Sequence, residues 1–315
     1  MHRKALVFSG QGAQFVGMGK DLADRYDVCR ELFCRADEVL GYGISRICFE
    51  GPDSELTKSN HCQPAIFIVS AACYAALRAE TGDIAFEGLA GLSLGEWTAL
   101  YAAGALTFDD ALRVLEARGR FMQEACDERE GGMVSVIGLP MDKIQEICDS
   151  CGTEIANLNS DAQTVLSGEK SAVTEAARLA QEKGAKRAIV LNVAGAFHSS
   201  LMASAARRLE TILDGIEILP PRVPVVANVT GEPHKDVDSI RRNMVRQVTE
   251  SVRWVSCVEW LKSKGVNAYV ECGPGKVLTG LIKRIDAAAS LHNIQDSTTL
   301  SKTVQALGAD DSEAG

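Results

Sequence analysis

The sequence of 315 residues lacks the features that mark membrane and secreted proteins. It has no run of 18 apolar residues, so we predict no membrane-spanning helix and no membrane partner. Its start carries Arg3 and Lys4 but no long apolar segment, so we expect a first strand at residues 5–8 and no secretory signal. Hydrophobic residues make up 46% and charged residues 24%, which is typical of an ordered globular protein. We therefore expect a cytoplasmic protein.

Features of nucleic-acid, nucleotide and metal sites are also missing. The net charge of −9 argues against a nucleic-acid partner. Gly10 and Gly12, after the first predicted strand, belong to neither a G-x-G-x-x-G fingerprint nor a G-K-[ST] loop. Ten cysteines without a secretory signal indicate reduced thiols, and the pair Cys148 and Cys151 has no second pair at zinc-site spacing. We predict neither a nucleotide-binding loop nor a metal site.

A G-x-S-x-G pattern at residues 91–95 is the strongest signal that is present. It places Ser93 between a predicted strand at residues 86–90 and a helix without a breaker until Gly104. Such a turn exposes the serine at its apex, and the glycines leave room where a Cβ atom would clash. Free backbone N–H groups at the helix start can hold a developing oxyanion. A tight turn with an incidental serine explains the pentapeptide equally well, so other residues must decide.

A serine nucleophile needs a base, and the chain has five histidines. His2 lies near the start and His292 in a polar segment, where we expect surface positions. His61 fits the start of a helix, and His234 follows a Gly-Glu-Pro turn, where we expect a solvated side chain. His198 lies in a loop of small residues before an amphipathic helix, and loops on a scaffold often carry catalytic groups. We therefore select His198 as the candidate base.

An arginine interrupts an apolar stripe on a predicted helix from residue 107 to about residue 126. At 100° per residue, Ala111, Leu115 and Met122 share one face, and Arg118 lies in the middle of it. A buried arginine is costly unless an anion meets it. Two readings stay open here: a structural salt bridge to a buried acid, and a site for a substrate carboxylate.

The length and the hydrophobic pattern predict an α/β fold with two parts. Between residues 131 and 191 the pattern reads strand, helix, strand, strand, helix, strand, which is the ferredoxin-like order (βαββαβ). We predict a small ferredoxin-like subdomain at 130–192, inserted into a large domain made of 1–129 and 193–285. We expect 286–315 to be a polar C-terminal tail.

The motifs, taken together and in order, resemble the acyltransferase family of fatty-acid and polyketide synthases, and within it the malonyl-CoA:acyl carrier protein transacylases. The resemblance runs from residue 4 to about residue 285. One departure is Leu92, because the family commonly has histidine before the serine (G-H-S-L-G). The matching pieces are FSGQGAQ at 8–14, QPA at 63–65, GLSLGE at 91–96, RGRFMQ at 118–123, NLNS at 157–160, SG at 167–168, AFHS at 196–199, RQ at 246–247 and GPGKVL at 273–278.

The resemblance implies catalytic roles for five residues. Ser93 would be the acylated nucleophile and His198 its general base. The backbone N–H groups of Gln11 and Leu94 would form the oxyanion hole. Gln247 would orient His198, the family using a neutral main-chain acceptor in place of an acid.

The resemblance also implies the substrate contacts and the fold. Arg118 would hold the malonyl carboxylate, Gln63 and Asn157 would belong to the substrate site, and the ring of Phe197 would limit room for an α-methyl branch. The large domain would be α/β-hydrolase-like, with a parallel sheet.

The implied reaction is a ping-pong transfer of malonyl from malonyl-CoA, through malonyl-Ser93, to the phosphopantetheine thiol of acyl carrier protein. This reaction would supply fatty-acid synthesis and would need no cofactor and no metal. We expect a monomer whose partners are malonyl-CoA and the carrier protein. Because the carrier protein is acidic in this family, we select Lys186 and Arg187 as candidates for its docking patch.

Two alternative functions are compared with this transacylase reading. An α/β-hydrolase-type esterase or thioesterase would carry its serine, an acid and a late histidine in that order, whereas His198 lies in mid-chain. A non-catalytic carrier-protein docking module would keep the fold without the chemistry. The presence of Ser93, His198, Arg118 and Gln11 together argues against that module.

Overall fold

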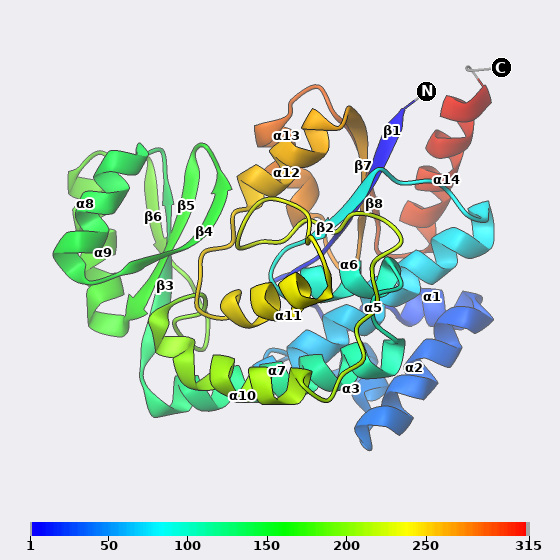
Figure 1. The fold of residues 1–315 in the computed structure, drawn as a ribbon, viewed down its shortest axis with the longest axis horizontal. Helices are drawn as coiled ribbons and strands as arrows, with labels where there is room; N and C mark the ends of the chain where they lie inside the picture. Colours follow the sequence, from blue (N-terminus) through cyan, green and yellow to red (C-terminus); the bar gives the residue numbers. More distant parts are fainter. Residues whose placement is uncertain (1, 313–315) are drawn as a thin grey trace.

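A four-stranded parallel sheet forms the centre of the larger lobe (Figure 1). The computed structural model describes residues 2–312. The strands follow the order β2-β1-β7-β8, so β1 is paired on both sides. Their bounds are β1 Arg3–Phe8, β2 Gly88–Gly91, β7 Val266–Cys272 and β8 Ser290–Ile294.

Helices cover both faces of this sheet, as a parallel sheet requires. Side chains alternate along β1, so Leu6 and Phe8 join the apolar cluster of α5, α6 and α7, and Ala5 and Val7 join that of α12 and α13. The helices of this lobe are α1 Lys20–Arg25, α2 Asp27–Leu40, α3 Ile44–Glu50, α4 Asp53–Leu56, α5 Ser59–Thr81, α6 Leu94–Ala102, α7 Phe108–Glu128, α10 Ala203–Leu213, α11 Val237–Arg246, α12 Trp254–Ser263, α13 Val277–Ile285 and α14 Ser297–Ser312, with a 3-10 turn at Ser200–Met202.

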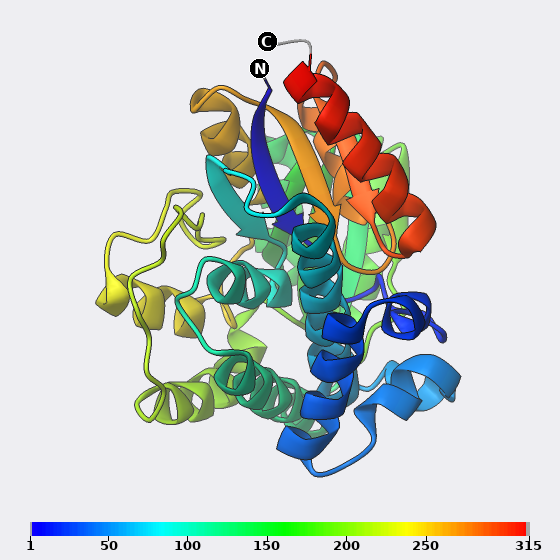
Figure 2. The ribbon, with the colours of Figure 1, turned by 90° about the vertical axis from the view of Figure 1, so that its right-hand side faces the viewer.

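Helix α5 alone, among the described residues, is long and apolar enough to cross a membrane by length and composition. However, 78% of its most apolar window is buried inside the protein. It packs against α2, α6 and α7 near the middle of the lobe (Figure 2). An apolar composition is equally compatible with a buried core helix, and α5 is the central core helix of this lobe.

The smaller lobe is a four-stranded antiparallel sheet in the order β4-β5-β3-β6, with two helices on one face (Figure 1). Val134, Ile144, Leu166 and Val173 form its own apolar core. The predicted order of strands and helices is confirmed, and we propose that residues 130–192 form the inserted subdomain. The bounds are β3 Gly131–Ile137, α8 Met141–Cys151, β4 Glu154–Ser160, β5 Gln163–Glu169, α9 Lys170–Glu182 and β6 Arg187–Val190.

The predicted fold class, α/β with a parallel sheet and a second small sheet, is confirmed. The polar tail expected at 286–315 is wrong within the described residues, because β8 pairs in parallel with β7 and α14 packs against β8. Its polar sequence contains Ile294, Leu300 and Leu307, which are all buried. We therefore propose that the large domain extends through α14; residues 313–315 of the expected tail lie outside the described residues.

Candidate active site

The turn from β2 into α6 holds Ser93 in a conformation that few residues adopt. Ser93 is the N-cap of α6, with φ 53° and ψ −109°. A Cβ atom on Gly91 would lie 2.0 Å from the carbonyl carbon of Gly95, and one on Gly95 would lie 2.2 Å from the carbonyl oxygen of Phe8. Both glycines are therefore required by close backbone approach, and the strained backbone places the serine hydroxyl at the apex.

Ser93 and His198 lie within hydrogen-bond distance, although 105 positions separate them in the chain. The distance from Ser93 Oγ to His198 Nε2 is 2.9 Å, and His198 Nδ1 lies 2.7 Å from the main-chain oxygen of Gln247. A carbonyl can only accept, so Nδ1 carries the proton and Nε2 is free to accept from the serine. Burial and the nearby Arg118 charge lower the pKa of His198 to about 4, which keeps the ring neutral at neutral pH and leaves Nε2 free to accept a proton.

Arg118 is buried beside this pair, with only 1% of its surface exposed. Its Nη1 donates to Gln63 Oε1 at 2.6 Å, and its Nη2 donates to Ser93 Oγ at 3.0 Å. Nη2 also donates to the side-chain oxygen of Gln247 at 3.2 Å. No carboxylate within residues 2–312 forms an ion pair with Arg118, so the reading as a structural salt bridge is not supported. Burial lowers the pKa of Arg118 to about 10, and the charge of Glu96 opposes this shift.

A cavity of about 920 Å³ opens onto these groups from between the two lobes. The predicted site residues that line it include side chains from both lobes: Gln11, Ser93, Arg118, Asn157, Phe197 and His198. Leu92 also lines it, so an apolar side chain stands beside the nucleophile. Leu94 occupies the first position of α6, where the backbone N–H has no acceptor within the helix.

The structure does not bring Gln63 to the cavity wall. Gln63 is fully buried on α5, and its carboxamide contacts Arg118 and the sulfur of Met122. The place of Gln63 in the substrate site therefore stays a prediction: in this structure Gln63 contacts the arginine and does not line the cavity.

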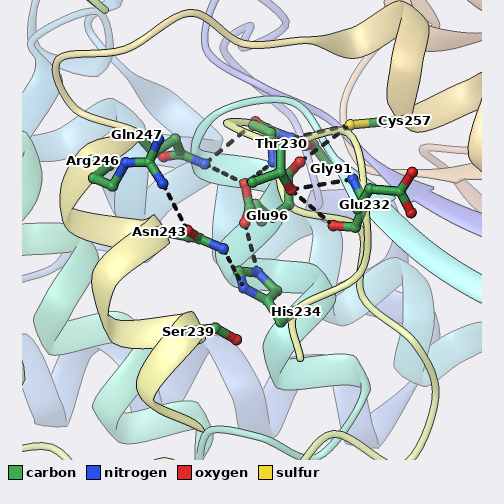
Figure 3. Close-up of polar contacts among 12 residues, drawn as sticks. Gly91, Glu96, Thr230, Glu232, His234, Ser239, Asn243, Arg246, Gln247 and Cys257 are labelled. Carbon is green, nitrogen blue, oxygen red and sulfur yellow. Dashed lines mark hydrogen bonds and ion pairs between the residues drawn. The ribbon is translucent and has the colours of Figure 1, made fainter. Parts of the chain in front are cut away.

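Sequence reasoning missed a buried polar network around Glu96 and Gln247 (Figure 3). The backbone N–H of Ser93 donates to Asn228 Oδ1 at 2.7 Å. Gln247 Nε2 donates to Glu96 Oε2 at 2.6 Å and to the main-chain oxygen of Ser93 at 3.1 Å. His234 was expected to be solvated, but its side chain is fully buried and lies 2.8 Å from Glu96 Oε1. A carboxylate in the apolar helix directly after the serine motif was the one local signal for this network.

Residues 5–305 match the acyl transferase domain family. The chain is 38% identical to a malonyl CoA-acyl carrier protein transacylase of Bacillus subtilis over 319 residues, with all of both chains covered. It is 40% identical to the protein of the same name from Haemophilus influenzae, covering 94% of this chain and 96% of the relative.

Solved structures agree with these sequence matches. An acyl-carrier-protein-S-malonyltransferase from Bartonella henselae superposes with a TM-score of 0.93 at 38% identity, covering 97% of this chain and 99% of the other. A malonyl-transacylase solved in complex with its type II polyketide synthase acyl-carrier protein has a TM-score of 0.93 at 39% identity, with 96% and 99% covered.

Proposed function

The chain belongs to the acyl transferase domain family, and on that premise we propose that it transfers malonyl from malonyl-CoA to the phosphopantetheine thiol of an acyl carrier protein. One observation carries the proposal: a buried arginine lies 3.0 Å from a serine hydroxyl that is itself 2.9 Å from a neutral histidine. A hydrolase of uncharged esters has no use for that cation, whereas a malonyl thioester presents a carboxylate to it.

In the first half-reaction Ser93 Oγ attacks the thioester carbonyl and its proton passes to His198 Nε2. The oxyanion of the tetrahedral intermediate accepts hydrogen bonds from the backbone N–H groups of Leu94 and Gln11. The C–S bond then breaks, and His198 returns the proton to the departing CoA sulfur. The products are CoA and malonyl-Ser93.

The second half-reaction reverses these steps with a different thiol. His198 takes the proton of the carrier protein's phosphopantetheine thiol, and the sulfur attacks the ester carbonyl of malonyl-Ser93. The C–O bond breaks, and His198 protonates the serine oxygen as it leaves. The enzyme returns to its starting state, and the malonyl group is a thioester of the carrier.

The neutral acceptor behind His198 suits thioester chemistry. The Nδ1 proton is held by the main-chain oxygen of Gln247, not by a carboxylate. A thiol has a pKa of about 8.5, so a thiolate leaves with less help from an acid than an amine does. A strongly charged orienting group is therefore less necessary than in a peptidase.

We expect the rate of malonyl-Ser93 formation to stay constant from neutral pH down to about pH 5 and to fall with a midpoint near pH 4. The sign follows from the lowered pKa of His198, because the ring loses its basicity only when it is protonated below that value. Stopped-flow measurement of acyl-enzyme formation across pH 3.5 to 8, roughly the range over which histidine and carboxyl groups titrate, tests this. Circular dichroism at each pH verifies that the fold persists. A midpoint near the ordinary value of 6.5 would contradict the assigned environment of His198.

We propose that the carrier protein docks on β6, at the edge of the small lobe. Lys186 and Arg187 are exposed there, and the neighbouring Ile189 and Val190 are 46% and 54% exposed. The chain then continues into the cavity wall at residues 191–194, so a phosphopantetheine arm has a short path to Ser93. Exposed apolar side chains beside cations fit an acidic protein with an apolar patch.

Reversing both charges, Lys186→Glu with Arg187→Glu, should raise the KM for the carrier protein about tenfold and leave the KM for malonyl-CoA unchanged. Lys302→Glu is the matched control, because it reverses one exposed charge on α14 at the opposite end of the molecule (Figure 1). An unchanged carrier KM in the double variant would exclude this docking surface.

We further propose that the enzyme works as a monomer in the cytoplasm, without metal or cofactor, and supplies fatty-acid synthesis. All ten cysteines are free, as a reducing compartment allows. The main alternative, a thioesterase, predicts that malonyl-CoA is hydrolysed as fast without carrier protein as malonyl is transferred with it. A steady-state assay of CoA release with and without holo carrier protein separates the two.

A further inference from the structure

Glu96 is a buried carboxylate that the proposed reaction does not use. It lies in the first turn of α6, three residues after Ser93, and 1% of its surface is exposed. Three donors surround it: the backbone N–H of Asn228 at 3.0 Å, Gln247 Nε2 at 2.6 Å and His234 Nε2 at 2.8 Å (Figure 3). A buried carboxylate needs such hydrogen-bond donors, but these donors alone do not supply a positive charge to compensate it.

The direct partners of Glu96 can all hold it as neutral donors. The Asn228 N–H and the Gln247 amide are neutral donors. The other ring nitrogen of His234 faces the Asn243 amide nitrogen at 3.4 Å, so a neutral ring with its proton on Nε2 satisfies both contacts. With the ring in this neutral form, the charge that balances Glu96 comes from beyond these three groups.

Gln247 connects Glu96 to Arg118. Its side-chain nitrogen donates to Glu96, and its side-chain oxygen accepts from Arg118 Nη2. The other acceptors of Arg118 are the neutral groups of Gln63 and Ser93. The two buried, opposite charges thus lie one carboxamide apart, and the Glu96 charge favours the charged form of Arg118 against its burial.

We propose that Glu96 is the resident counter-charge of Arg118 and sets how tightly the enzyme holds the malonyl carboxylate. The inference rests on the proposed function. In the empty site Glu96 compensates the buried cation. When malonyl arrives, two carboxylates share one guanidinium, and their repulsion weakens the hold on the acyl group. Glu96 is a positioning residue, since it acts on the substrate only through Gln247 and Arg118.

Glu96→Gln removes the charge and keeps the shape. Its oxygen can still accept from Asn228 and Gln247, and its NH₂ group can donate to His234 once that ring carries its proton on Nδ1 and Asn243 turns its carboxamide. The malonyl-CoA concentration that half-saturates acyl-enzyme formation should fall about tenfold. The value for acetyl-CoA should change less than about twofold, and transfer of malonyl to the carrier should slow about tenfold, because the acyl group is held more tightly.

Glu271→Gln is the matched control. Glu271 is also a carboxylate with 1% exposure in the large lobe, but it accepts from Leu278 and Thr279 at the start of α13. Its loss should lower the thermal midpoint and leave the half-saturating malonyl-CoA concentration unchanged. An unchanged or higher malonyl-CoA value in Glu96→Gln, or equal shifts for malonyl and acetyl, would overturn the counter-charge role while the proposed function stands. Wild-type protein that forms no malonyl-Ser93 would overturn the proposed function itself, and this inference with it.

A second variant covers the case in which Glu96→Gln does not fold. The proposal then attributes the failure to an uncompensated buried Arg118, so adding Arg118→Met should restore a cooperative thermal transition. A double variant that remains unfolded would contradict the pairing of the two charges.

Discussion

Ser93→Ala should abolish the acyl-enzyme and lower the transfer rate by a factor on the order of 10⁴ or more. The loss is this large because Ser93 Oγ is the nucleophile that His198 Nε2 contacts, at 2.9 Å, and alanine offers no oxygen in its place. Intact-protein mass spectrometry after mixing with malonyl-CoA, together with a carrier-protein transfer assay, measures both effects.

The fold should survive the loss of Ser93. Arg118 keeps its hydrogen bonds to Gln63 and Gln247, and the backbone contacts of position 93 to Asn228 and Gln247 do not involve the hydroxyl. A thermal midpoint close to that of the wild type is the control. Transfer at the wild-type rate by a folded Ser93→Ala protein would refute the assignment of the nucleophile.

Arg118→Ala should lower the use of malonyl-CoA about 10²–10³-fold more than the use of acetyl-CoA. The malonyl carboxylate would enter a buried site without its cation, whereas acetyl has no charge to satisfy. The change also leaves Gln63 Oε1 without its donor, so stability should fall as well. A loss of stability lowers kcat/KM for both thioesters alike. The malonyl-to-acetyl ratio of kcat/KM therefore reports the role of the charge separately from that loss.

Arg120→Ala provides a matched control on the same helix. Arg120 lies on the exposed face of α7 with Glu116 and Glu124 as its partners, so its loss should leave the malonyl-to-acetyl ratio unchanged. Equal losses for both thioesters in Arg118→Ala would mean that the arginine supports the structure and does not select the substrate.

The main site residues could be predicted because each has a local signal. Gly91 and Gly95 are required by contacts within the turn and with β1, so the pentapeptide itself indicates Ser93. The 100° periodicity of α7 indicates that Arg118 is buried, and the structure confirms that burial. No local rule relates positions 93, 118 and 198. The prediction that Ser93 and Arg118 lie beside His198 therefore depended on the ordered family motifs.

The polar network could not be predicted, because tertiary packing creates it. Glu96 and His234 are 138 positions apart, and a histidine after a Gly-Glu-Pro turn reads as solvated until α6 and α11 enclose it. Strand β8 was missed for a similar reason. Its residues 290–294 are mostly polar or half-buried, and only the parallel ladder with β7 makes them a strand.

Peptide mapping by mass spectrometry, on wild-type protein mixed with malonyl-CoA and then with holo acyl carrier protein, tests the central claim most directly. The account predicts one malonyl group on the peptide that contains Ser93, and its complete transfer to the carrier's phosphopantetheine thiol in the second step. No adduct, an adduct on another residue, or release of free malonate at the same rate without carrier protein would contradict it.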